Sequence, residues 1–287
     1  MGQALYEREP IARAVFDQAD DLLGFSLSTL CFEGPADTLT DTINQQPALF
    51  VTSLAVWQVI EQNGQWSPAG YMAGHSLGEL SALTAAGAIS FADGLALVRR
   101  RGQLMKWAGE QEPGAMAAVL GLAFEQVAEL CQQASLELSR PVQVANDNCP
   151  GQLVISGDKA ALERAVTLAE SAGAKKVVIL PITIAAHSPL MASAATQFAQ
   201  AVADTPIFAP QVVVIGNVTA RPVTTPAEIR AELTAQLTGN VRWSDSMRYL
   251  RQQQCETFIE VGPGDILSSL IKRIDRTAQR HRIELSD

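Results

Sequence analysis

The stretch that most constrains this chain is "GHSLG" (residues 74–78), in which Ser76 lies between two glycines and just ahead of an apolar run. The G-x-S-x-G spacing is typical of a sharp strand-to-helix turn, where glycines permit a strained backbone and the serine hydroxyl stands above a sheet. N–H groups at the start of the next helix, that of Leu77 first, are suited to hold an oxyanion. Because five-residue patterns also arise by chance, an ordinary glycine-rich turn is the alternative.

A serine nucleophile needs a base, and the chain has only three histidines. His75 adjoins Ser76, and on a sharp turn its side chain should point away, so we interpret it as structural. His281 lies in a charged tail and is expected to be solvated. His187 ends "PITIAAH" at the tip of an expected strand, where loops carry catalytic groups. It is the best candidate for the base, with a satisfied loop histidine as the alternative.

Composition excludes several classes of protein. A hydrophobic content of 47% against 18% charged residues indicates a well-filled core over the 287 residues, as one large domain or a large one with a smaller insert. The net charge of −9 argues against a nucleic-acid binder, which needs a basic face. Residues 177–203 carry no charged side chain, but prolines interrupt them, and we predict no membrane span.

The cysteines and the N-terminus predict the cellular compartment of the protein. The four cysteines show no C-x-x-C spacing, and with three histidines we predict no metal site and no cofactor. Reduced thiols and the lack of an apolar leader segment predict a cytoplasmic protein.

The middle of the chain predicts a small subdomain. Strands are expected at 114–122, 142–146, 152–157 and 175–184, and helices at 123–135 and 158–173. The order β-α-β-β-α-β is that of a ferredoxin-like unit, so we predict such a subdomain over 112–184, inserted into a larger α/β domain formed by 1–111 and 185–287. In the larger domain, helices are expected after Pro47, from Leu77 to Ala86 and from Phe91 to Trp107, with buried parallel strands at 211–217 and 257–264.

Several blocks in one order resemble a known family. They are "QPALFVTS" (46–53), "AGHSLGELSAL" (73–83), "RRRGQLM" (99–105), "GAMAAVLGL" (114–122), "NDNCPGQLVISG" (146–157), "PITIAAHSPLM" (181–191), "GNV" (216–218), "QLTGNVRW" (236–243) and "EVGPG" (260–264). On these the chain is similar to malonyl-CoA:acyl carrier protein transacylases, including the acyltransferases of polyketide assembly lines. The resemblance implies an α/β hydrolase-like core with a parallel sheet that carries the ferredoxin-like subdomain.

The resemblance also implies roles for site residues. Ser76 becomes the acyl-accepting nucleophile, His187 its base, and Arg101 the partner of the malonyl carboxylate. A guanidinium suits that carboxylate because it offers two parallel charge-assisted hydrogen bonds, whereas Arg99 and Arg100 are as well explained by a solvated helix face. The family's histidine is oriented by a backbone carbonyl, here that of Gln236.

Two further residues carry weaker expectations from the same resemblance. Asn148 is similar to an asparagine near the site, with a turn residue before Pro150 as the alternative, and Met116 to a residue that lines the acyl pocket. Small Ala185 and Ala186 precede His187, where bulkier residues are thought to recognise the malonyl α-carbon. They leave open whether a methyl-branched unit is accepted, since one methylene discriminates by only ~1–3 kcal/mol.

The N-terminus departs from the family pattern. Members begin with a strand and a glycine-rich loop whose glutamine N–H supports the oxyanion, whereas this chain opens "MGQALYE", which resembles the family's segment just after that loop. We expect that the sequence starts late and that the natural protein has the missing strand and loop.

The expected reaction is ping-pong transfer of a malonyl group from malonyl-CoA to the phosphopantetheine thiol of acyl carrier protein, by a monomer. The alternatives are an acyl hydrolase, a malonyl transferase that serves a malonate decarboxylase and, from another class, a non-catalytic docking subunit. Carrier proteins are usually acidic, so docking needs a local basic patch. Lys175-Lys176, Arg99-Arg100 and the tail from Lys272 are the candidates.

Overall fold

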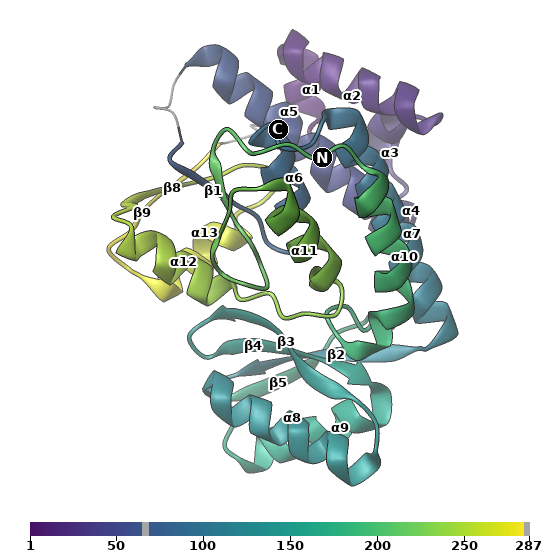
Figure 1. The fold of residues 1–287 in the computed structure, drawn as a ribbon, viewed down its shortest axis with the longest axis vertical. Helices are drawn as coiled ribbons and strands as arrows, with labels where there is room; N and C mark the ends of the chain where they lie inside the picture. The colour runs from purple at the N-terminus through teal and green to yellow at the C-terminus, as the bar shows by residue number, and fades with distance from the viewer. Residues whose placement is uncertain (65–68, 284–287) are drawn as a thin grey trace.

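The structure is a computed structural model that describes residues 1–64 and 69–283. Figure 1 shows a larger part made of helices and small sheets, and below it a smaller part in which a four-stranded sheet is covered on its outer face by two helices. Helices and strands are mixed along the chain. The fold is therefore mixed α/β, as the sequence predicts.

The N-terminal third is helical. Its helices are α1 (Gln3–Arg8), α2 (Pro10–Leu23), α3 (Leu27–Glu33), α4 (Ala36–Thr40), α5 (Thr42–Asn63), α6 (Gly78–Ala85) and α7 (Phe91–Gln111). Their inner faces enclose the largest hydrophobic cluster, where Phe16, Phe50 and Leu83 are fully buried. This apolar burial fixes α5, α6 and α7 against one another, and these three helices carry or adjoin the candidate site.

Helix α5 begins earlier than the sequence predicts. The sequence places Pro47 near the helix start, but the helix begins at Thr42, where the Asp41 carboxylate accepts the Ile43 N–H at 3.1 Å. Pro47 has no N–H to donate to the Ile43 carbonyl four residues earlier. The Arg99 guanidinium of α7 donates to that carbonyl instead, at 2.7 Å. The interior proline is accommodated because a neighbouring helix supplies the missing donor.

The strands of the larger part form two separate small sheets. β1 (Tyr71–Ala73) pairs in parallel with β6 (Val213–Ile215), whose other edge is taken by the antiparallel β7 (Pro222–Val223). β8 (Thr257–Glu260) pairs in parallel with β9 (Gln279–Arg282). The expected parallel pairing is present, but the predicted strands at 211–217 and 257–264 are shorter than expected. Among the described residues these two strands belong to separate sheets, β1-β6-β7 and β8-β9.

The smaller part has the predicted order of elements. It runs β2 (Gly114–Leu120), α8 (Phe124–Leu138), β3 (Val142–Cys149), β4 (Gln152–Asp158), α9 (Lys159–Ser171) and β5 (Lys176–Ile179). The sheet order is β3-β4-β2-β5 with antiparallel neighbours, and a second hydrophobic cluster fills the space under α8 and α9. The last strand is shorter than the predicted 175–184, since Pro181 has no N–H for a sheet. The division at 112 and 184 stays a prediction.

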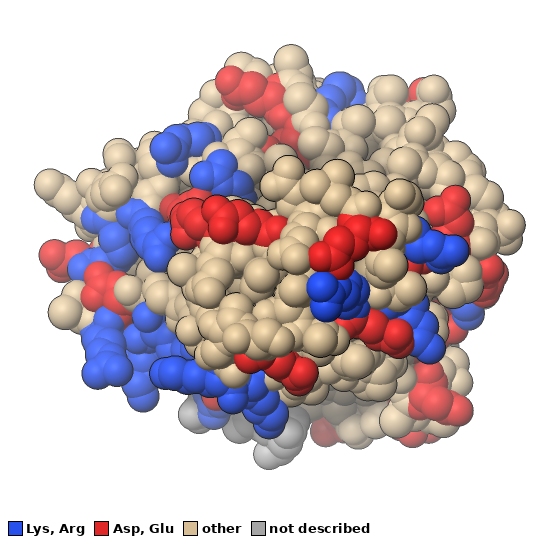
Figure 2. All heavy atoms as spheres, turned by 90° about the horizontal axis from the view of Figure 1, so that it is seen from below, with Lys and Arg blue, Asp and Glu red and all other residues tan. Residues whose placement is uncertain are grey.

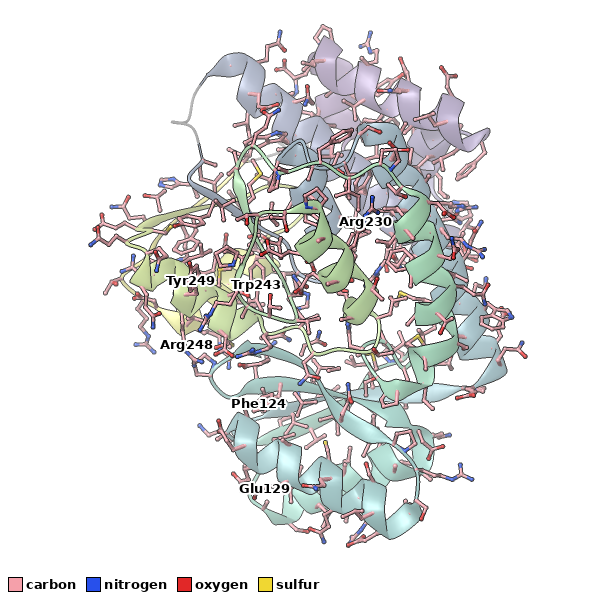
Figure 3. All side chains as sticks on the ribbon, viewed as in Figure 1. Phe124, Glu129, Arg230, Trp243, Arg248 and Tyr249 are labelled. Atoms are coloured by element: carbon pink, nitrogen blue, oxygen red, sulfur yellow. The ribbon has the colours of Figure 1, made fainter. Side chains whose placement is uncertain are left out.

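The C-terminal elements complete the junction between the two parts. They are the 3₁₀ turn Pro189–Met191, α10 (Ala192–Asp204), α11 (Pro226–Gln236), α12 (Trp243–Gln252) and α13 (Ile266–Ile274). Figure 3 shows Trp243, Arg248 and Tyr249 on α12, which packs beside β3 of the smaller part. None of the helices in the described part of the chain combines the length and apolar character needed to cross a membrane.

Candidate active site

The turn between β1 and α6 holds Ser76 in a strained conformation. Ser76 has a φ of 53°, which L-residues seldom adopt. A Cβ on Gly74 would lie 1.9 Å from the Gly78 carbonyl oxygen, so the first glycine of the motif is required by close backbone approach, whereas Gly78 has open space. The N–H groups of Gly78 and Glu79 close the turn on the carbonyls of residues 75 and 76, and neither bond uses the Leu77 N–H.

Asn217 fastens this turn to β6. Its side-chain Oδ1 accepts the Ser76 N–H at 2.6 Å, and its Nδ2 donates to the Gly74 carbonyl at 2.7 Å. Asn217 is buried and lies two residues after the end of β6, the strand that pairs with β1. We did not single out Asn217 from the sequence, although it stands in the "GNV" block. In the sequence it is marked only as a short polar residue after a buried strand. Such residues are common in loops, so this signal alone is too weak to predict a functional role.

Ser76 and His187 lie in hydrogen-bond contact although 111 positions separate them. The Ser76 Oγ is 2.8 Å from His187 Nε2. The other ring nitrogen, Nδ1, lies 2.8 Å from the Gln236 carbonyl oxygen and 3.2 Å from that of Gly239. Carbonyl oxygens only accept, so Nδ1 carries the proton and Nε2 presents its lone pair to the serine hydroxyl. The arrangement suits a general base held by backbone dipoles.

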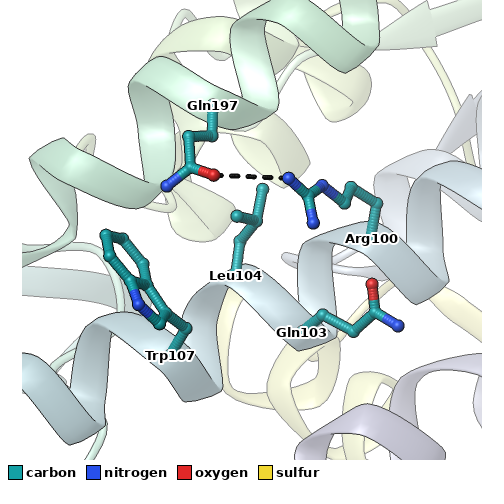
Figure 4. Close-up of a pocket in the computed structure, with 5 residues that line it drawn as sticks. All are labelled: Arg100, Gln103, Leu104, Trp107 and Gln197. Carbon is teal, nitrogen blue, oxygen red and sulfur yellow. Dashed lines mark hydrogen bonds between the residues drawn. The ribbon is translucent and has the colours of Figure 1, made fainter.

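Arg101 is the third group on the serine. Its guanidinium is 2% exposed, and Nη2 donates to Ser76 Oγ at 3.0 Å and to the Gln236 side-chain oxygen at 2.9 Å. Nη1 donates to Gln46 at 2.8 Å. The neighbouring arginines point elsewhere. Arg99 bonds the carbonyl of Ile43, and Arg100 reaches Gln197 on α10 across an outer pocket (Figure 4).

Glu79 is a buried acid that sequence reasoning missed. It is fully buried on α6, and Oε2 accepts the Gln236 side-chain Nε2 at 2.5 Å. The same amide group also donates to the Ser76 carbonyl at 3.0 Å. Gln236 therefore contributes more than the backbone carbonyl expected of it, since its side chain links Glu79, Ser76 and Arg101.

The remaining predicted residues lie beside this centre rather than in it. His75 Nε2 is 2.8 Å from Asn148 Oδ1, and its ring packs against Trp243 with centroids 5.7 Å apart. Asn148 thus bonds His75 and neither Ser76 nor His187. Met116 is buried on β2 in a small cluster that the partly buried Ala186, next to His187 in sequence, packs against.

The third histidine and the cysteines take no part in the contacts described above. His281 is exposed on β9. All four cysteines are free thiols. Within 1–64 and 69–283, no three His, Cys, Asp or Glu side chains gather as a metal site.

Burial and charge shift the ionisation of the three central groups. Burial, followed by the positive charge of Arg101, lowers the pKa of His187 from its ordinary 6.5 to about 3. Burial also lowers the pKa of Arg101 to about 10, which leaves it charged at neutral pH. Burial, with the neighbouring Glu232, raises the pKa of Glu79 to about 8. At pH 7 the site thus combines a neutral base, a cation and a largely protonated acid.

Known proteins match this chain along most of its length. Residues 1–283 match the family model described as an acyl transferase domain. The malonyl CoA-acyl carrier protein transacylase of Bacillus subtilis is 44% identical over 276 residues, which are 96% of this chain and 86% of that one.

Solved structures agree with this match. An acyl carrier protein S-malonyltransferase from Vibrio cholerae superposes with a TM-score of 0.95 at 40% identity, covering 99% of this chain and 92% of that one. A malonyl-transacylase in complex with a type II polyketide acyl carrier protein gives a TM-score of 0.95 at 36% identity, covering 99% and 91%. With nearly all of its length matched in these ways, the chain is an acyltransferase and belongs to the acyl transferase domain family.

Proposed function

We propose that this protein moves a malonyl group from CoA to the phosphopantetheine thiol of acyl carrier protein through an acyl-enzyme on Ser76. The observation that carries the proposal is that the Ser76 hydroxyl contacts both a neutral imidazole and a buried guanidinium, at 2.8 and 3.0 Å. The first contact suits activation of a nucleophile, and the second suits an anionic acyl group beside it. The names of the relatives point to the same donor and acceptor.

In the first half-reaction, His187 Nε2 takes the hydroxyl proton as Ser76 Oγ attacks the thioester carbonyl carbon. The carbonyl oxygen becomes an oxyanion, which the Leu77 N–H at the start of α6 stabilises. When the intermediate collapses, the carbon–sulfur bond breaks and the CoA sulfur receives the proton from His187. The malonyl group remains as an ester on Ser76.

The second half-reaction runs through the same groups. His187 Nε2 takes the proton of the phosphopantetheine thiol, and the sulfur attacks the ester carbonyl. Collapse breaks the bond to Ser76 Oγ, which recovers the proton from His187. The lowered pKa keeps His187 neutral over the physiological pH range, so the ring can accept a proton at the start of both half-reactions.

Arg101 is the residue that selects an acyl group with a free carboxylate. Its Nε is buried and has no hydrogen-bond partner among the described residues, while Nη2 is next to the nucleophile. Nε–H and an Nη2 hydrogen form one edge of the guanidinium, which suits bidentate binding of a carboxylate. The carboxylate then replaces one of the two present Nη2 acceptors, Ser76 Oγ or the Gln236 side-chain oxygen. An unpartnered buried donor is costly unless a ligand completes it, and a malonyl carboxylate provides that acceptor.

The surface charge fits an acidic carrier despite the net charge of −9. Figure 2 shows lysines and arginines gathered toward one side of the face seen from the smaller part. Of the basic segments considered from the sequence, Lys272 and Arg273 are exposed on α13, whereas Arg99 is turned inward. Electrostatic attraction of this kind raises the association rate with an acidic partner.

The test is the intact mass of the protein before and after brief exposure to malonyl-CoA without carrier protein. We expect a malonyl adduct on the wild-type protein and none on Ser76→Ala. Addition of carrier protein should then move the mass of the malonyl group to the carrier. Loss of the adduct to water with no gain by the carrier supports the hydrolase alternative. A folded protein that forms no adduct contradicts the proposal.

A further inference from the structure

We propose that Gln143, on strand β3 of the smaller part, is a positioning residue for the base His187. The inference rests on the proposed function. The side-chain Nε2 of Gln143 donates to the His187 carbonyl oxygen at 2.9 Å and to the Thr238 carbonyl oxygen at 2.8 Å. The amide has two hydrogens, so these two bonds use both of them. One side chain thereby joins the backbone that carries the imidazole to the loop that orients it.

The second carbonyl lies within the segment that holds the imidazole. His187 Nδ1 is bonded by the carbonyls of Gln236 and Gly239, and Thr238 lies between them in sequence. Gln143 thus ties together both sides of the hydrogen bond that fixes the tautomer of the base. A shift of this segment relative to His187 would move the Nε2 lone pair away from Ser76.

The backbone of the smaller part brings Gln143 to this position. Ala145 and Asp147 of β3 exchange hydrogen bonds with Val241, through Val241 N–H to Ala145 O at 2.8 Å and Asp147 N–H to Val241 O at 2.9 Å. Figure 1 shows the chain that leaves α11 passing over β3. The register set at Val241 places Gln143, two residues before Ala145, opposite the segment 238–240.

His187 needs such a tie because its backbone is strained. Its φ is 57°, in the left-handed region that a histidine seldom adopts. A conformation of this kind persists only where surrounding contacts determine it. The Gln143 bond to the His187 carbonyl is a contact of this kind, made from a different part of the fold. Without it the residue is freer to relax to a negative φ, and the ring leaves the serine.

The experiment compares Gln143→Met, which keeps the length of the side chain and removes both N–H donors, with the wild type. Gln133→Met on α8 is the matched control, since Gln133 is exposed and its side chain donates to Glu137 one turn along the same helix. We measure the rate of malonyl-enzyme formation by rapid quench and the KM for malonyl-CoA. Because a misplacement of about 1 Å can cost ~10²-fold in rate, we expect acylation to slow by ~10- to 100-fold. The KM should stay within about twofold, and the control should match the wild type.

The ¹⁵N signals of the imidazole provide a readout independent of turnover. The chain has three histidines, so His187→Ala identifies the signals. We expect the wild type to show one fixed tautomer with Nδ1 protonated, and Gln143→Met to show signals averaged between tautomers. A Gln143→Met protein that keeps both the fixed tautomer and the wild-type acylation rate overturns the inference. A wild-type protein that forms no acyl-enzyme contradicts the proposed function instead, while the tautomer comparison still decides the role of Gln143.

Discussion

Replacement of Arg101 by alanine should change which acyl group the enzyme accepts. In the proposed acyl-enzyme, the malonyl carboxylate would lie beside the guanidinium of Arg101, a residue that is 2% exposed. Removing one partner of a buried ion pair costs ~3–5 kcal/mol. At ~1.4 kcal/mol for each factor of ten, kcat/KM for malonyl-CoA should fall by ~10²- to 10³-fold or more. Acetyl-CoA has no carboxylate, so with this substrate the variant loses only the contacts of Arg101 with Ser76, Gln46 and Gln236, which are lost with malonyl-CoA as well.

The assay follows CoA release from malonyl-CoA and acetyl-CoA with carrier protein present. The matched control is Arg100→Ala, because Arg100 is the preceding residue on α7, is exposed, and contacts Gln197 at the surface (Figure 4). The ratio of kcat/KM values, malonyl over acetyl, should fall at least ~10-fold in Arg101→Ala and stay unchanged in the control. Equal losses with the two substrates would refute the reasoning, since Arg101 would then serve the serine and not the carboxylate.

Two other substitutions test the buried contacts of the turn. Asn217→Ala removes the partners of the Ser76 N–H and the Gly74 carbonyl, and should lower the unfolding free energy by ~1–3 kcal/mol in urea titrations and lower kcat as well. Glu79→Gln should flatten the pH dependence of stability. The pKa of Glu79 is raised to about 8, so the folded state binds more protons than the unfolded state from about pH 4.5 upward. Wild-type stability should therefore fall between about pH 4.5 and 8, more than that of Glu79→Gln, in unfolding titrations at pH 5.5 and 8.5.

The candidate site residues that sequence patterns single out are those with strong local signals. The turn at Ser76 is specified by a glycine that no other residue can replace at that backbone approach. His187 is singled out because the chain has only three histidines. Arg101 is singled out because the block "RRRGQLM" (99–105) resembles one of the transacylase family. All three meet at the serine hydroxyl, although no sequence pattern measures a distance between segments.

The supporting residues could not be predicted in this way. Asn217, Glu79 and Gln143 are polar residues in segments that the sequence predicts as a strand, a helix and a strand, and those patterns assign no distant contact to their side chains. Their contacts join segments 44 to 157 positions apart, so their roles exist only after the chain has folded. The same holds for Pro47, whose place inside α5 depends on a donor from α7. Propensity describes neighbours in sequence, and tertiary contacts overrule it.

Both hydrogen bonds of His187 Nδ1 go to backbone carbonyls, so no carboxylate of the described residues 1–64 and 69–283 contacts this nitrogen to raise the pKa of the ring. Burial and the charge of Arg101 hold the pKa of free His187 near 3, so kcat/KM should have no acid limb at the ordinary histidine value of 6.5. In the proposed complex, the malonyl carboxylate compensates the positive charge of Arg101 and removes the part of the lowering that this charge causes. The pKa of His187 should therefore be higher in that complex. An acetyl group carries no charge, so the pKa of His187 should stay low with acetyl-CoA. The check is the acid limb of kcat, which reports the complex: it should lie at higher pH for malonyl-CoA than for acetyl-CoA. Superimposable limbs would mean that the substrate charge does not reach the base.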